Sequence, residues 1–246
     1  MLKYLEPLDW LPTAEDLPDC DSTPVDSELQ EFIPTFLKTL LISIWADRQD
    51  WFFGIDMGVY YSPDEPAIVP DGFLAIGVER IKSENLRLSY VLWEEQVLPQ
   101  LAIEVVSKKY RGEYSTKKDF YEQLGILYYV VYNPRRKRKP SLEIYKLIQG
   151  QYVQMVGNIV WMPELAIGIG KERFNYEGYD REWLFWYDEN NQRYPTAEEK
   201  VAQAQIQAQQ AQNQAQQAQI QAQQAQAQTK RLADRLRALG IDPDQV

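Results

Sequence analysis

Apolar residues recur every three or four positions in two parts of the chain, which is the spacing of an amphipathic helix. The first part spans residues 26–46, where one face collects Leu29, Phe32, Ile33, Phe36, Leu37, Leu40, Leu41 and Ile44. The second is the shorter stretch 114–124. We therefore expect two helices, the first of which has a wide buried face.

Short apolar runs before and after the second helix predict β-strands. The expected strand segments are 51–61, 70–77, 88–95, 101–107 and 126–134, then a hairpin of 141–148 and 150–156 that turns at Gly150, and a stretch from 159 to 169. Residues 79–90 are ambiguous. The alternation of strands with helices predicts an α/β sandwich with a mixed central sheet.

The tail after Pro195 has a different pattern. Thr196 and Glu199 have the spacing of a capping box, and from there a seven-residue repeat of mostly alanine continues to Leu239. Gly240 and Pro243 supply stop signals. We predict a globular domain over 1–195, one helix of ~43 residues or ~65 Å over 196–240, and a short end at 241–246.

The repeat in this tail allows two outcomes. A strict seven-residue period indicates a coiled-coil seam and hence a homo-oligomer through the C-terminal helix. Alanine buries so little area, however, that the middle heptads would associate weakly, and a lone, partly frayed helix fits as well. Both outcomes stay open at this stage.

Composition removes several kinds of chemistry. The chain has no histidine, which excludes Ser-His and Cys-His nucleophiles and histidine-bound zinc. Its single cysteine, Cys20, lies in a polar segment and is better explained as a surface thiol than as a nucleophile. The start of the chain lacks a signal-peptide pattern and no apolar run is long enough to span a bilayer, so we expect a cytoplasmic protein without a membrane segment.

The net charge of −10 counts against a nucleic-acid partner, because duplex-binding proteins usually carry a basic surface. The tail from residue 196 has five acids and five bases, so the whole excess lies in residues 1–195. Attraction of DNA would have to come from local basic patches or from a bound cation.

Three residues suggest a metal-dependent hydrolase: Asp71, Glu104 and Lys117. Each also has a simpler explanation, namely a turn in Pro-Asp-Gly, a structural ion pair, and an i,i+4 pair with Glu113. Glu104 is the most informative, because it interrupts the apolar run LAIEVVS and a buried carboxylate needs a cation or a base. On the following helix, Lys117 and Tyr121 share a face, whereas Lys118 points elsewhere.

The order Pro-Asp, Glu-Val-Val-Ser, a helix with Lys117 and Tyr121, and then GILYYVVYNP resembles the Uma-type putative restriction endonuclease family of the PD-(D/E)XK nuclease superfamily. The resemblance covers about residues 10–170 and implies a restriction-endonuclease-like fold. It implies Mg²⁺, or Mn²⁺ in its place, on Asp71, Glu104 and the Val105 carbonyl, with Lys117 as the catalytic lysine. Val106 stands where the superfamily has its usual lysine. Glu28 is a candidate for a further carboxylate near the metal.

The leading hypothesis is therefore a Mg²⁺-dependent endonuclease that hydrolyses phosphodiester bonds in DNA. One alternative is a catalytically inactive nuclease-fold module that binds nucleic acid or a protein partner, and another is a scaffold assembled through the tail. The basic run from Arg135 to Lys139 either grips a phosphate backbone or is a solvated turn.

Overall fold

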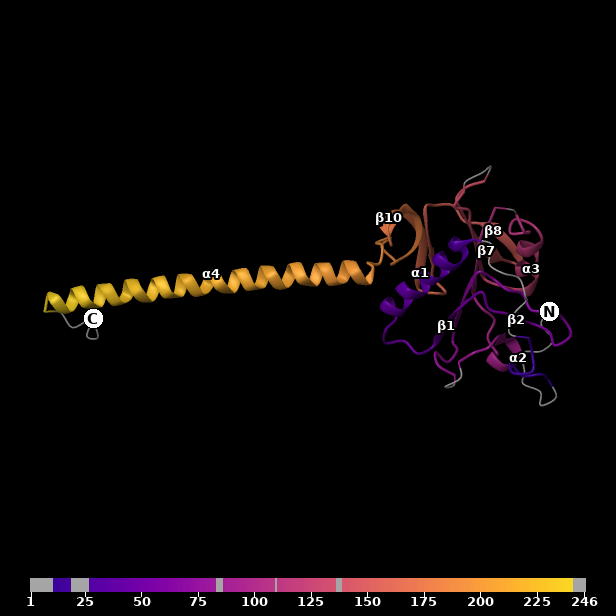
Figure 1. Ribbon diagram of the computed structural model, residues 1–246, viewed down its shortest axis with the longest axis horizontal. Coiled ribbons are helices and arrows are strands. Elements are labelled where there is room, and N and C mark those ends of the chain that lie inside the picture. The colour runs from indigo at the N-terminus through magenta and orange to yellow at the C-terminus, as the bar shows by residue number, and fades with distance from the viewer. Residues whose placement is uncertain (1–10, 19–26, 83–85, 109, 136–138, 241–246) are drawn as a thin grey trace. The chain divides into compact units, whose positions relative to one another are not determined.

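The structure is a computed structural model that describes residues 11–18, 27–82, 86–108, 110–135 and 139–240 (Figure 1). Cys20, the expected chain end at 241–246 and the middle of the basic run, Arg136 to Arg138, lie outside these residues. The chain divides into two compact units, Met1–Tyr194 and Pro195–Val246.

The first unit contains a six-stranded sheet in the order β1-β3-β5-β6-β7-β8. Its strands are β1 (Trp51–Ile55), β3 (Gly72–Ile76), β5 (Leu101–Val105), β6 (Tyr128–Tyr132), β7 (Leu142–Ile148) and β8 (Gln151–Gln154). Strands β5 and β6 are parallel and are joined by α3 (Thr116–Leu124), while the other neighbours are antiparallel. The predicted α/β class with a mixed sheet and flanking helices is confirmed.

The two faces of this sheet are covered by different helices. Helix α1 (Glu28–Ile44) packs against Leu101, Ile103 and Val105 of β5 on one face. On the other face, Tyr121 and Leu124 of α3 pack against Ala102 and its neighbours. Because β5 is covered on both sides, all five of its residues are buried. Glu104 is therefore a carboxylate in the centre of the fold.

The stretch 159–169 is not one strand, as we had expected, but parts of two. Strand β9 (Ile159–Met162) ends at a turn in which Ala166 has φ 51°, and β10 (Ile167–Tyr176) then returns antiparallel to it. A further strand that was not predicted, β11 (Tyr179–Tyr187), pairs with β10. A two-residue turn with positive φ at Glu177 and Gly178 joins them, as is typical of tight hairpins.

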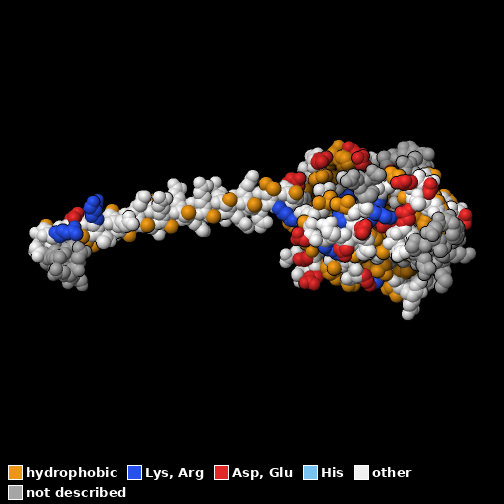
Figure 2. Space-filling view, turned by 90° about the horizontal axis from the view of Figure 1, so that it is seen from below, with side chains coloured by type: hydrophobic (Ala, Val, Ile, Leu, Met, Phe, Trp, Pro, Cys, Tyr) orange, Lys and Arg blue, Asp and Glu red, His pale blue; other side chains and the backbone are white. Residues whose placement is uncertain are grey.

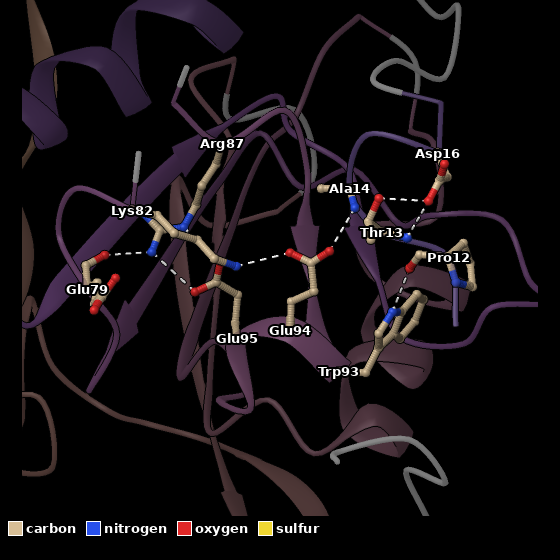
Figure 3. A network of polar contacts seen from close by, with 10 residues as sticks. All are labelled: Pro12, Thr13, Ala14, Asp16, Glu79, Lys82, Arg87, Trp93, Glu94 and Glu95. Carbon is tan, nitrogen blue, oxygen red and sulfur yellow. Dashed lines mark hydrogen bonds and ion pairs between the residues drawn. The ribbon is translucent and has the colours of Figure 1, made fainter. Parts of the chain in front are cut away.

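Residues 88–95 were also predicted wrongly as a strand. Only β4 (Tyr90–Val91) is extended, pairing in parallel with β2 (Val59–Tyr60), and a helical turn, α2 (Leu92–Glu95), follows at once. Tertiary contacts explain the difference (Figure 3). The Trp93 indole N–H donates to the Pro12 carbonyl at 2.8 Å, and Glu94 accepts from the Ala14 N–H at 2.8 Å.

These contacts tie residues 11–18 to the globular unit and line an open cleft of about 790 Å³. The basic side chains in the cleft are already neutralised (Figure 3). Lys82 lies 3.0 Å from Glu94 and 3.1 Å from Glu95, and Arg87 lies 2.9 Å from Glu95. Trp93 and Glu94 therefore anchor the N-terminal segment at one side of the cleft.

The second unit contains α4 (Ala197–Ala238), a helix of 42 residues. The predicted capping box is present, since the Glu199 N–H donates to Thr196 Oγ1 at 3.2 Å and the Thr196 N–H donates to Glu199 at 2.9 Å. No charged residue occurs between Lys200 and Lys230, so that the helix surface is almost uncharged along most of its length (Figure 2). No residue of α4 is buried. Among the described helices, none is both long enough and apolar enough to cross a bilayer.

Candidate active site

Asp71 comes directly before β3, and Glu104 lies on the neighbouring strand β5. Gly72 of β3 pairs with Ile103 of β5, and continuing this antiparallel register by one residue sets Asp71 against Glu104. Residues directly opposite in an antiparallel pair point to the same face of the sheet, with Cβ atoms ~5 Å apart. The two side chains are only 8% and 1% exposed. The fold thus creates a buried pair of carboxylates.

The glycine after Asp71 brings the first helix close to this pair. A Cβ on Gly72 would lie 3.2 Å from the Pro34 side chain of α1 and 3.3 Å from the Phe53 ring. Only a residue without a side chain leaves room for both at ordinary contact distances. Helix α1 therefore passes directly over the start of β3, and its first turns reach Asp71.

Glu104 is held by two residues of α3. The Lys117 ammonium donates to Glu104 Oε2 at 2.7 Å, and the Tyr121 hydroxyl donates to Oε1 at 2.7 Å. The expectation that Lys117 and Tyr121 share one face of the helix is confirmed. Lys118 points to the other side, with its ammonium 4.2 Å from the centroid of the Tyr145 ring.

Asp71 is held by the strand beside it and by α1. Its Oδ2 accepts from the Val105 N–H at 2.6 Å, and its Oδ1 accepts from the Gln30 side chain at 3.3 Å. Together with the bonds to Glu104, these contacts give all four carboxylate oxygens a partner within the protein. The carbonyl expected as a metal ligand belongs to Val105, whose N–H makes this contact.

Gln30 is a site residue that the sequence analysis missed. We had considered Glu28 for this part of the helix, but Glu28 instead accepts from the Tyr179 hydroxyl at 3.3 Å. Residues two apart on a helix face in different directions, so only one of the two can point at the start of β3. The polar character of Gln30 at the edge of the apolar face was the one available signal.

Burial and mutual repulsion shift the ionisation of the two carboxylates. Burial, followed by the charge of Glu104, raises the pKa of Asp71 to about 8 despite the bond from the Val105 N–H. Burial also raises the pKa of Glu104, and the bonds from Lys117 and Tyr121 only partly oppose it. The pair therefore tends to retain a proton when no further cation is near.

For Lys117, the charges of its neighbours have a larger effect on the pKa than burial has. Burial alone would lower the pKa of its ammonium, but the negative charges of Glu104, Asp71 and Glu113 outweigh this and raise the pKa. Glu113 does not pair with Lys117 in the way we had considered. It is itself buried, at 3% exposed, and accepts from the Arg111 N–H at 2.7 Å. Lys117 remains a cation, 29% exposed, at the rim of the carboxylate pair.

The donor set fits a hard divalent cation. Carboxylates and backbone carbonyls are its preferred ligands, and Mg²⁺ commonly uses only one or two carboxylates together with water and phosphate oxygens. Within the described part of the chain, no group of three or more Asp, Glu, Cys and His side chains is arranged so that it could hold a metal ion by itself. The site thus has the two carboxylates suitable for magnesium and lacks the sulfur and imidazole ligands typical of zinc.

Two residues of the predicted basic run are described. The Arg135 N–H donates to Asn133 at 3.2 Å, and the Lys139 ammonium lies 4.7 Å from the centroid of the Tyr114 ring. Both side chains are exposed beyond the end of β6. These contacts fit a turn on the surface as well as a phosphate contact.

Among the comparisons with known proteins, the match to a family model agrees with the resemblance noted in the sequence. A search of curated proteins found no match. One similar solved structure is described as a putative nuclease belonging to DUF820 from Anabaena variabilis, with 13% identity, a TM-score of 0.41, and coverage of 62% of this chain and 88% of that one. The family model Uma2, described as Putative restriction endonuclease, matches residues 22–170, more than half of the chain. The chain belongs to the Uma2 family.

Proposed function

We propose that the protein is a Mg²⁺-dependent endonuclease that hydrolyses phosphodiester bonds in DNA. The family supports a nuclease. The observation that carries the finer proposal is the opposed pair Asp71 and Glu104 with the Lys117 ammonium 2.7 Å from Glu104. This combination brings hard oxygen ligands and a lysine cation, paired with one of those ligands, to one place, which suits phosphodiester hydrolysis.

In this proposal Asp71, Glu104 and the Val105 carbonyl hold the metal, Mg²⁺ or Mn²⁺. A divalent ion there would lower the pKa of a bound water and neutralise charge on the scissile phosphate. The protein groups behind the ligands fix their positions: Tyr121 holds one oxygen of Glu104, and Gln30 holds one oxygen of Asp71. Loss of such a supporting contact typically lowers metal affinity or activity by ~10- to 100-fold.

Lys117 has the properties of a residue that acts on the reacting phosphate. Its ammonium is charged, is held at the rim of the pair by Glu104, and is partly open to solvent. From this position it can orient the attacking water or stabilise the negative charge that develops on the phosphate oxygens. The helical position of Lys117, rather than one in β5, accounts for Val106 in place of the usual lysine.

The test is cleavage of supercoiled plasmid with Mg²⁺ or Mn²⁺ by the full chain. We expect nicking by the wild type and loss of nicking in Asp71→Asn and Glu104→Gln, with the Lys118→Met variant as a matched control on α3. Cleavage that persists in both carboxylate variants would exclude this site. No cleavage by any version, with DNA binding retained, would favour the inactive binding module.

We further propose that α4 joins copies of the chain. Its large apolar side chains near the end are exposed, with Leu232 at 63% and Leu239 at 71%, and both belong to the seven-residue repeat. An exposed leucine pair at the spacing of a coiled-coil seam favours a helical partner. A second copy of the same helix is the simplest one.

A further inference from the structure

A group of basic side chains covers the aromatic residues at the outer edge of the six-stranded sheet. We call it the β1 cation cluster, and its members are Lys38, Arg48, Arg80 and Arg87. Their distances to ring centroids are 3.8 Å for Arg80 over Trp51, 4.6 Å for Arg87 over Phe52, 6.0 Å for Lys38 from Phe52 and 4.5 Å for Arg48 over Trp45. These four side chains thus gather at the rings of two consecutive residues of β1 and of Trp45, which contacts Trp51.

Two members of the cluster are neutralised and two are not. Arg48 makes two bonds to Asp50, at 2.8 and 2.9 Å, and Arg87 makes two bonds to Glu95, at 2.9 and 3.1 Å. For Lys38 and Arg80, no carboxylate in the described part of the chain lies within the 4.0 Å of an ion pair. Among the described residues, the positive charges of Lys38 and Arg80 therefore have no counter-charge within ion-pair distance.

The surroundings make these two charges unfavourable as they stand. Burial and the charge of Arg80 lower the pKa of the Lys38 ammonium, and burial and the charge of Arg87 lower the pKa of Arg80. Trp51, on which Arg80 lies, is 1% exposed and its indole N–H has no hydrogen-bond partner among the described residues. This end of β1 therefore has an excess of donors and of positive charge, which an anion would relieve.

The β1 cation cluster and the carboxylate pair lie at opposite ends of β3. Trp51 pairs with Ile76, at the opposite end of β3 from Asp71, so the two places are ~17 Å apart along the strand. Helix α1 links the same places, because Gln30 contacts Asp71 and Lys38 follows about two turns later, ~12 Å along the axis. A duplex advances that distance in about five base pairs or fewer.

We propose that Lys38 and Arg80 form a phosphate-binding site that holds the backbone of the nucleic-acid substrate at a distance from the carboxylate pair. The choice of nucleic acid as the source of the phosphate rests on the proposed function. The inference that this site binds an oxyanion rests only on the β1 cation cluster. Arginine offers planar N–H donors and lysine a compact charge, and both are used for phosphate recognition.

A simpler role for the cluster is protection of an edge strand. Charged side chains on an outer strand prevent pairing with another chain, and β1 is such a strand. That role needs only charges that point outward. It does not require two cations to repel each other while partly buried, and it predicts no affinity for phosphate.

The first experiment measures binding of inorganic phosphate at fixed ionic strength by broadening of the phosphorus NMR line. The wild type is compared with Lys38→Gln/Arg80→Gln and with Lys146→Gln/Arg173→Gln, which removes a lysine and an arginine that already have carboxylate partners. We expect broadening with the wild type and the control pair and none with the cluster variant. Equal broadening in all three would overturn the proposal, and melting curves verify that each variant is folded.

The second experiment measures the affinity for duplex DNA over a range of salt concentrations, with all proteins carrying Asp71→Asn to prevent cleavage. Loss of two phosphate contacts should reduce the slope of log affinity against log salt by ~1.8 in the cluster variant and by nothing in the control. An unchanged slope with intact DNA binding overturns the substrate role. Phosphate binding at Lys38 and Arg80 in a protein that neither binds nor cuts DNA would keep the anion site and reject the nuclease proposal.

Discussion

The Lys117 ammonium lies 2.7 Å from Glu104 Oε2, so a cation from helix α3 already occupies one side of the buried carboxylate. A carboxylate that is 1% exposed requires such a partner when no metal is bound. The same contact keeps Lys117 next to the place where a phosphate would be hydrolysed. The pair thus links the stability of the metal-free protein to its proposed chemistry, and separate substitutions distinguish the two.

Substitution of Lys117 should reduce catalysis and, without metal, should also destabilise the fold, because Glu104 loses its cation. Lys117→Met removes the charge proposed to act on the phosphate, and we expect cleavage to fall by roughly 100-fold or more. Lys118→Met on the same helix, whose ammonium lies over the Tyr145 ring, should retain cleavage within a few-fold. Equal rates for the two variants in a plasmid-nicking time course would contradict the role of Lys117.

The hydroxyl of Tyr121 should matter through Glu104. Tyr121→Phe leaves Glu104 Oε1 without its 2.7 Å donor, which for a buried acceptor costs ~1–3 kcal/mol of unfolding free energy. Because Tyr121 positions a proposed ligand, metal affinity should also fall by ~10- to 100-fold. Urea unfolding and metal titration measure the two effects. A loss of stability with no change in metal affinity would restrict Tyr121 to a structural role.

The raised pKa of Asp71 makes stability depend on pH in a defined direction. Between its ordinary value of 3.8 and its native value of about 8, the folded protein keeps a proton that the unfolded chain has released. Without metal, the unfolding free energy should therefore decrease as the pH rises through this window, by at least ~1.4 kcal/mol, the equivalent of one pKa unit. Glu104, whose pKa is also raised, acts in the same direction.

Denaturant unfolding at a series of pH values tests, in two comparisons, whether the raised pKa of Asp71 causes this pH dependence of stability. Asp71→Asn imitates the protonated carboxyl and should flatten much of the pH dependence. Addition of Mg²⁺ near pH 8 should restore stability to the wild type, because metal ligands bind in the deprotonated form. A metal-free wild type whose stability rises with pH over this window would show that burial does not control Asp71.

Removal of the tail tests its proposed role in assembly. Deletion of residues 196–246 should leave the globular unit folded, because no residue of α4 is buried. If the helix joins copies of the chain, the solution mass measured by light scattering should fall from that of an oligomer to that of a monomer. A full-length protein that is already monomeric would contradict self-association.

The contacts of Glu104 with Lys117 and Tyr121 were predictable because these residues belong to strong local patterns. Glu104 interrupts an apolar run that must form a buried strand, and Lys117 and Tyr121 have the spacing of one helix face. The bond between the two elements follows because a crossover helix packs on the strand that precedes it. Likewise, the capping box at Thr196 was visible because it depends on residues only three positions apart.

Other features depend on contacts between distant segments and were not predictable. Gln30 reaches Asp71 across 41 positions, and no local pattern separates it from Glu28. Residues 92–95 turn into a helix, and Trp93 there bonds the backbone of Pro12. The hairpin of β10 and β11 is polar around its turn, and its buried apolar residues lie at the start of β10 and the end of β11, where they pack in the same core as α1.

The most direct test of the proposed metal site is calorimetric titration of Mn²⁺ or Mg²⁺ into the metal-free full chain, beside Asp71→Asn and Glu104→Gln. We expect one ion per chain in the wild type, with release of protons near pH 7 because the carboxylate pair must deprotonate. Binding should be lost in both variants and retained in Glu28→Gln. Undiminished binding in the two carboxylate variants, or none in the wild type, would contradict a metal site at Asp71 and Glu104.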